Sequence, residues 1–204
     1  MVLCFIDGTS CLGKTTIADY SNDLTTHAEN VAVLKRLVES GHSQWRALYA
    51  INFMIDLDNL YEDKVYDRSP LSLIAYSILN SLNGMHASPD KFGERLDAAF
   101  TEDMCQYLRD VFSTVACRYS GAKFIIAVAG DPEHTAAVMN RRDGILDSGD
   151  TTVWYVYNQN RVFIKMYEIL KQGYGHLLQL VYVDKFLNKS LISDNGMGIC
   201  KTIL

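Results

Sequence analysis

Short apolar runs alternate with longer segments of helical periodicity along this chain of 204 residues. The runs are rich in β-branched and aromatic residues, which is typical of strands. They cover residues 2–6, 31–34, 65–66, 124–128 and 178–183. The first, fourth and fifth runs lack a polar alternation, so they predict strands that are buried on both faces of a parallel sheet.

Six helices are predicted between these runs, over residues 14–26, 42–60, 70–83, 89–118, 132–142 and 151–172. Three of them begin at a proline, where the missing N–H costs no hydrogen bond. Each proline also follows a residue that caps helices well, namely Ser69, Ser88 or Asp131. The alternation of strands and helices predicts an α/β fold with a parallel sheet that binds its ligand at the carboxyl ends of the strands.

The composition is that of a globular domain, with 49% hydrophobic and 21% charged residues and no linker or internal repeat. We therefore expect one domain over residues 1–204. The net charge of −5 argues against duplex nucleic acid as a partner. No segment has the ~18 apolar residues that a membrane span needs. Five scattered cysteines predict free thiols, and hence a reducing, cytoplasmic location.

Residues 8–15 match the pattern G-x-x-x-x-G-K-[ST] in full, between a predicted strand and a predicted helix. In this pattern the glycines let backbone N–H groups surround an anion. Lys14 would reach the β- and γ-phosphates of ATP, and the hydroxyl of Thr15 would bind Mg²⁺. ATP and Mg²⁺ are therefore the expected ligands. The residues predicted to bind them are Gly8, Thr9, Ser10, Cys11, Leu12, Gly13, Lys14, Thr15 and Thr16.

Two further segments carry charges suited to phosphoryl transfer. Asp67 and Arg68 end a predicted strand, where Asp67 would hold Mg²⁺ and Arg68 would neutralise the moving phosphoryl group. Arg141 and Arg142 precede an Asp/Ser/Gly-rich stretch and predict a lid loop at about 140–150 that closes over ATP. The alternative for Asp67 and Arg68 is an ion pair at a helix start. The alternative for Arg141 and Arg142 is a solvated basic turn.

Taken in order, the segments IDG-x4-GKTT, DRSPLS, PEH…NRRDG and a final strand ending in VD resemble the deoxynucleoside kinase and thymidylate kinase superfamily over most of the chain. The opening also resembles viral thymidine kinases. The resemblance implies a three-layer P-loop kinase fold with a five-stranded parallel sheet flanked by helices. It also implies ATP as phosphate donor, a nucleoside or nucleotide as acceptor, and a homodimer.

Some positions resemble the deoxynucleoside kinases. Glu39 and Trp45 match an E…WR segment in which the glutamate takes the proton from the sugar 5′-hydroxyl. Asp7 is a second carboxylate near the loop. Three further candidates to read a base edge are Gln44, Tyr49 and Asn52.

Other positions resemble the thymidylate kinases. Ser72 and Tyr76 fit a D-R-x-x-x-S-x-x-A-Y pattern in which the tyrosine lines the base pocket, and Arg36 resembles an arginine after the second strand. Phe53, however, stands where that family has an arginine for the acceptor phosphate. We therefore expect a deoxynucleoside kinase that favours thymidine or another pyrimidine. The alternatives are a thymidylate kinase and a nucleotide-binding regulatory protein without catalysis.

Overall fold

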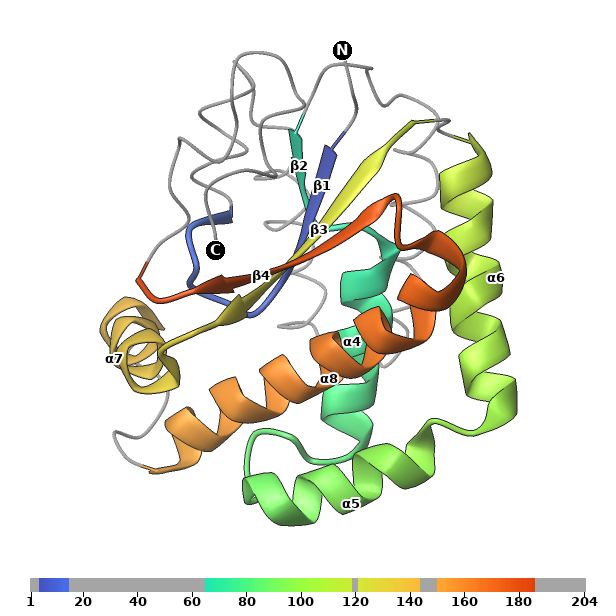
Figure 1. The fold of residues 1–204 in the computed structure, drawn as a ribbon. Helices are drawn as coiled ribbons and strands as arrows, with labels where there is room; N and C mark the ends of the chain where they lie inside the picture. The colour runs from blue at the N-terminus through green and yellow to red at the C-terminus, as the bar shows by residue number, and fades with distance from the viewer. Residues whose placement is uncertain (1–3, 15–64, 119–120, 144–149, 186–204) are drawn as a thin grey trace, which may run out of the picture.

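The computed structural model of the chain describes residues 4–14, 65–118, 121–143 and 150–185. Within them, four strands form one sheet: β1 (Cys4–Gly8), β2 (Val65–Asp67), β3 (Lys123–Ala129) and β4 (Leu178–Val183). Their order across the sheet is β2-β1-β3-β4, and every neighbouring pair is parallel (Figure 1). The predicted parallel α/β sheet is confirmed.

The sheet of the described residues has four strands, whereas five were predicted. The predicted strand over 31–34 lies outside the described residues, as do the predicted helix over 42–60 and all but Lys14 of the predicted helix over 14–26. Strand β1 runs two residues past its predicted end, because Asp7 and Gly8 still pair with Ile126 and Ala127 of β3.

Five helices of the described residues follow β2: α4 (Pro70–Ser81), α5 (Pro89–Ala99), α6 (Glu102–Arg118), α7 (Pro132–Asp143) and α8 (Asp150–Tyr174). As predicted, each proline is the first residue of a helix. Two of the predicted caps also form hydrogen bonds. The Ser69 hydroxyl accepts the N–H of Leu71 at 3.1 Å, and the Asp131 carboxylate accepts the N–H of His134 at 2.9 Å. Ser88 makes no such side-chain bond.

The prediction of one helix over 89–118 is wrong. Phe100 leaves the helical conformation with a ψ of 63°, and its side chain is buried in the core. The hydroxyl of Thr101 then accepts the backbone N–H of Met104 at 3.3 Å and so caps a new helix. Two acidic residues in the first turn of α6 support the same start.

Side chains of β1 and β3 alternate between two hydrophobic clusters, one on each face of the sheet. Those in the first cluster are Phe5, Phe124, Ile126 and Val128, which pack against α4, α5, α6 and α8. Those in the second are Cys4, Ile6, Ile125, Ala127 and Ala129, which pack with side chains of α7 and the start of α8. Within the described ranges, no helix has the length and apolar character that crossing a bilayer requires.

Candidate functional site

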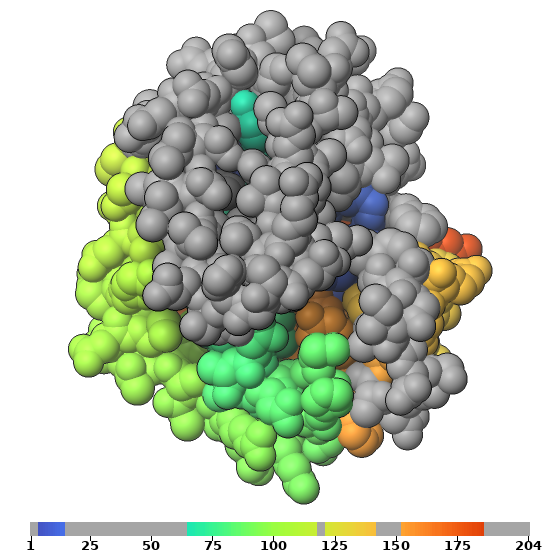
Figure 2. Space-filling view, turned by 180° about the vertical axis from the view of Figure 1, so that it is seen from behind, coloured from blue at the N-terminus to red at the C-terminus, as the bar shows by residue number. Residues whose placement is uncertain are grey.

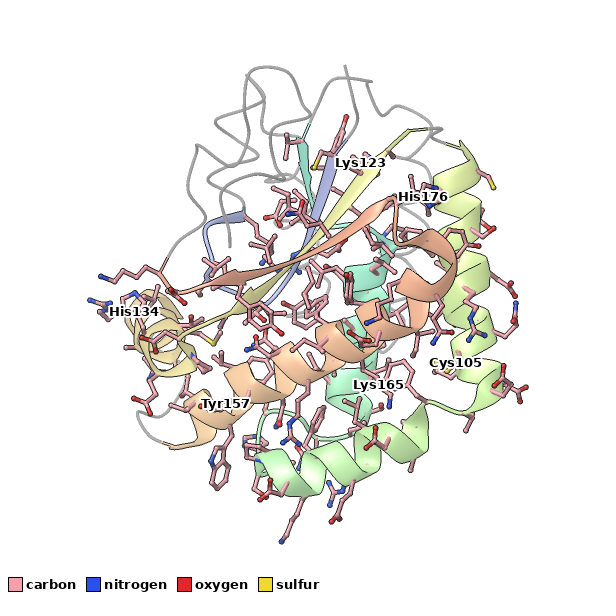
Figure 3. All side chains as sticks on the ribbon, viewed as in Figure 1. Cys105, Lys123, His134, Tyr157, Lys165 and His176 are labelled. Carbon is pink, nitrogen blue, oxygen red and sulfur yellow. The ribbon has the colours of Figure 1, made fainter. Side chains whose placement is uncertain are left out.

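The candidate site lies where the carboxyl ends of the parallel strands meet. From β1 the chain passes to β2 on one side and later to β3 on the other, so the strand order reverses at β1. Ligands of open α/β sheets bind at such a reversal. Figure 3 marks the two edges of the sheet: His134 lies on α7 at the carboxyl edge, whereas Lys123 and His176 lie at the amino edge. The loop that follows β1 emerges at the carboxyl edge, near α7 (Figure 1).

The backbone of this loop takes left-handed conformations at three positions, Gly8 (φ 126°), Cys11 (φ 62°) and Gly13 (φ 81°). A Cβ atom at Gly8 would lie 1.8 Å from the carbonyl oxygen of Ala127, so only glycine fits there. The N–H of Thr9 donates to that same carbonyl oxygen at 2.9 Å. The loop therefore leaves the sheet in direct contact with β3, and loops that contain left-handed residues can form anion-binding concavities.

Lys14 folds back across the loop. Its side chain is 4% exposed, and its Nζ donates a hydrogen bond to the carbonyl oxygen of Thr9 at 2.5 Å. Burial lowers the pKa of Lys14 to about 8, although the charge of Asp67 opposes the shift. A buried ammonium group bonded to the backbone of a glycine-rich loop is favourable for a polyanionic ligand, because the anion would compensate its lost hydration.

Two residues predicted to bind ATP direct their side chains into the protein instead. The hydroxyl of Thr9 is buried and donates to Oδ1 of Asn160 at 2.6 Å. Leu12 is fully buried and belongs to the hydrophobic cluster that includes Met139 and Val156. Thr9 and Leu12 therefore anchor the loop, and the backbone N–H and carbonyl of Thr9 are also bonded within the protein. Atoms of residues 4–14 reach the surface in the view from behind (Figure 2).

Asp7, predicted to bind the acceptor, is engaged within the protein. One carboxylate oxygen accepts the N–H of Ser69 at 2.8 Å and the hydroxyl of Ser72 at 2.6 Å, and the other accepts the hydroxyl of Ser69 at 2.6 Å. Burial nevertheless raises the pKa of Asp7 above its ordinary value, against the effect of these three donors. Asp7 and Ser72 thus fix the start of α4 and the turn that carries Arg68.

Arg68 follows β2 with a φ of 84°, which is rare for a residue other than glycine and is a strain found at functional sites. Its N–H donates to the carbonyl oxygen of Ile6 at 3.0 Å, which ties the turn to β1. Its guanidinium carbon lies 5.1 Å from the centre of the Tyr76 ring. The Tyr76 hydroxyl is in turn 2.9 Å from the hydroxyl of Ser10. Arg68 and Tyr76 therefore adjoin the loop together.

The sequence reasoning missed the residues of α8 that contact this cluster. Gln159 accepts the N–H of Ser10 at 3.0 Å and the Tyr76 hydroxyl at 3.2 Å. Tyr155 lies near enough to Tyr76 and Arg68 for their charges to influence its pKa, which burial raises. The available signal was the run Asn-Gln-Asn at 158–160, which is polar where the helical periodicity predicts a buried position.

The first residues of the predicted lid segment are helical. Residues 140–143 are the last turn of α7 rather than a loop, and the Nε of exposed Arg141 donates to the carbonyl oxygen of Ala137 at 3.2 Å. The side chain of Arg142 and residues 144–149 lie outside the described part of the structure. So do the remaining predicted site residues: Thr15, Thr16, Arg36, Glu39, Gln44, Trp45, Tyr49, Asn52 and Phe53.

Asp67 is the described residue best suited to Mg²⁺. Asp67 is the last residue of β2 and is 6% exposed, and its charge acts to raise the pKa of Lys14. The described residues contain no group of three or more His, Cys, Asp or Glu side chains that could hold a metal by themselves. Magnesium commonly takes one or two carboxylates and completes its shell with phosphate oxygens and water, so a single carboxylate beside a phosphate loop fits it.

Comparison of the chain with protein-family models, with curated proteins and with solved structures found no match.

Proposed function

We propose that this protein is an ATP-dependent kinase that phosphorylates the 5′-hydroxyl of a deoxynucleoside, with thymidine or another pyrimidine favoured. The observation that carries the proposal is the buried Lys14 ammonium in the glycine-rich loop after β1, next to Arg68 from the neighbouring strand end. Both cations lie at the point where an α/β sheet binds ligands, and both are suited to phosphate charge.

Each residue would have a distinct part in the reaction. The backbone N–H groups of residues 11–13 and the Lys14 ammonium would bind the β- and γ-phosphates of ATP, because the N–H groups of Thr9 and Ser10 already donate to Ala127 and Gln159. Arg68 would stabilise negative charge on the transferring group. Asp67 would hold Mg²⁺, which supplies charge neutralisation between the phosphates when bound. The Tyr76 ring, between Arg68 and the loop, would border the acceptor.

In the transfer, a bond forms between the acceptor 5′-oxygen and the γ-phosphorus, and the bond from that phosphorus to the β–γ bridging oxygen breaks. The hydroxyl proton passes to a carboxylate, for which the resemblance offers Glu39. The products are ADP and the nucleoside 5′-monophosphate. Catalysis of this kind consists mainly of positioning and charge stabilisation.

A thymidylate kinase is the second candidate. It is favoured by the contact of Arg68 with Tyr76, whose spacing fits the pattern D-R-x-x-x-S-x-x-A-Y. It is disfavoured by Phe53, since an acceptor with a phosphate group needs a cation at that position.

A substrate panel separates these functions. Each deoxynucleoside and each deoxynucleoside monophosphate is incubated with ATP labelled at the γ-phosphate, and the labelled products are identified. We expect label in a pyrimidine deoxynucleoside monophosphate, and none with the Lys14→Met variant. Label only in diphosphates would select the thymidylate kinase. ATP binding without transfer to any acceptor would select the regulatory protein.

A further inference from the structure

The middle of α8 contains three consecutive amide residues, Asn158, Gln159 and Asn160, that are 0%, 0% and 8% exposed. Buried amides cost free energy unless they are hydrogen-bonded, so their presence in the core requires a reason. Successive residues of a helix point in directions about 100° apart. The three side chains accordingly have different partners: Gln159 and Asn160 bond to consecutive residues of the loop, and Asn158 bonds to residues away from it.

Asn160 connects the loop to the sheet. Its Oδ1 accepts the hydroxyl of Thr9 at 2.6 Å and the N–H of Ala129 at 2.9 Å, and its Nδ2 donates to the carbonyl oxygen of Ala129 at 2.8 Å. The two bonds to Ala129 fix the amide against the end of β3. The remaining bond holds Thr9, whose own carbonyl oxygen accepts the Lys14 ammonium. Asn160 therefore acts on Lys14 through Thr9.

Gln159 holds the next residue of the loop. Because the backbone N–H of Ser10 needs an acceptor, the amide must present Oε1 to it, and the same oxygen accepts the Tyr76 hydroxyl. Tyr76 in turn contacts the Ser10 hydroxyl and the Arg68 guanidinium. A single side chain of α8 thus joins the loop to the residues expected on the acceptor side.

We propose that Gln159 and Asn160 are positioning residues that hold the loop in its anion-binding shape before any ligand arrives. The inference rests on the proposed function, since it concerns the same loop and the same lysine. A loop held in this way binds a phosphate chain without a conformational cost. In a loop that samples other shapes, the apparent affinity is reduced in proportion to the fraction of molecules in the binding-competent shape.

The first test removes one hydrogen-bond donor with little change of volume. Thr9→Val eliminates the bond to Asn160, and Thr9→Ser retains a hydroxyl. The affinity for inorganic tripolyphosphate is measured by calorimetry. We expect Thr9→Val to bind about fivefold more weakly than the wild type, the effect of one hydrogen bond on the competent fraction, and Thr9→Ser to restore binding. Equal affinity of the wild type and Thr9→Val would overturn the proposal.

Asn158 provides a matched control. It is an equally buried amide of the same helix, but it donates to the carbonyl oxygens of Gly84 and Ala87, both at 2.8 Å and both away from the loop. Asn158→Leu is expected to lower the denaturation midpoint while leaving the tripolyphosphate affinity unchanged. An affinity loss equal to that of Thr9→Val would show that any defect in α8 weakens binding, and the positioning role would be lost.

The second test needs no ligand. Amide hydrogen exchange is followed by NMR in the free protein, with rates corrected for changes in global stability. Gln159→Leu removes the acceptor of the Ser10 N–H, so the exchange of this amide should accelerate about tenfold, whereas Asn158→Leu should leave it unchanged. Unchanged exchange in Gln159→Leu would refute the positioning role. If the wild type did not bind tripolyphosphate, the proposed function would fail, and the exchange rates would still decide the role of Gln159.

Discussion

Titration of Lys14 is expected to control how tightly the protein binds ATP above pH 8. Lys14 is 4% exposed, and its ammonium group donates a hydrogen bond to one backbone carbonyl oxygen. Burial lowers its pKa from 10.5 to about 8. Since one pKa unit corresponds to about 1.4 kcal/mol, the charged form is disfavoured in the folded protein by about 3 kcal/mol.

The sign of the effect differs between folding and binding. Between pH 8 and 10.5 the unfolded chain keeps the Lys14 proton and the folded protein loses it, so this group makes the protein more stable as pH rises through that window. A bound polyanion favours the ammonium form and raises its pKa in the complex. Above pH 8 binding must therefore take up a proton, and the affinity falls by up to about tenfold per pH unit.

Calorimetric titration with Mg²⁺·ATP from pH 7 to 9.5 measures this directly. At pH 9.5, about 1.5 units above the pKa, the dissociation constant should be about 30-fold higher than at pH 7. Lys14→Arg keeps its charge over the whole range, so its affinity should not vary with pH. Lys14→Met should bind weakly at every pH. A wild-type dissociation constant that is the same at pH 7 and 9.5, or a pH dependence that persists in Lys14→Met, would refute the reasoning.

Three further predictions concern single residues. Asp7→Ala leaves three donors without their acceptor and should lower the free energy of unfolding in urea by about 3 kcal/mol. Ser72→Ala removes one of these donors and should lower it by about 1 kcal/mol. Equal losses in the two variants would contradict the role of Asp7 as the shared acceptor. Gly8→Ala forces a Cβ onto the backbone of β3 and should lower the free energy of unfolding by on the order of 4 kcal/mol or more. Gly173→Ala, which has open space in α8, should raise the free energy of unfolding by up to about 1 kcal/mol. A Gly8→Ala protein as stable as the wild type would disprove the close approach of Gly8 to β3. Arg68→Gly relieves a left-handed backbone, so the melting temperature should hardly change. Turnover should fall about 100-fold or more, because the guanidinium that stabilises the transferring group is gone. Undiminished turnover would exclude a catalytic part for Arg68.

Local chemistry was enough to predict much of the fold. The prolines with their preceding cap residues located the starts of α4, α5 and α7 correctly, because these signals act within one helical turn. The break at Phe100 was missed because its apolar side chain continues the helical stripe of residues 89–118. The cap at Thr101 and the acidic turn after it were the overlooked signals.

The candidate site could be predicted only in part, for a physical reason. A motif gives the residue types near a ligand but not the direction of each side chain. The sequence therefore located the loop and Arg68, while it could not show that Thr9 turns inward to Asn160. That bond joins residues 151 positions apart, and no local pattern encodes such a pair. The same applies to Asp7, whose partners lie on α4 and in the turn before it.

In the proposed reaction, the loop and Lys14 bind ATP while its γ-phosphate passes to a sugar 5′-hydroxyl. The most direct measurement gives the protein γ-labelled ATP and either thymidine or 5′-deoxythymidine, which has the same base but lacks the accepting oxygen. We expect labelled thymidine 5′-monophosphate from the first, no labelled product from the second, and no transfer by Lys14→Met in either case. An absence of transfer to thymidine and to every other deoxynucleoside, or full transfer by Lys14→Met, would contradict it.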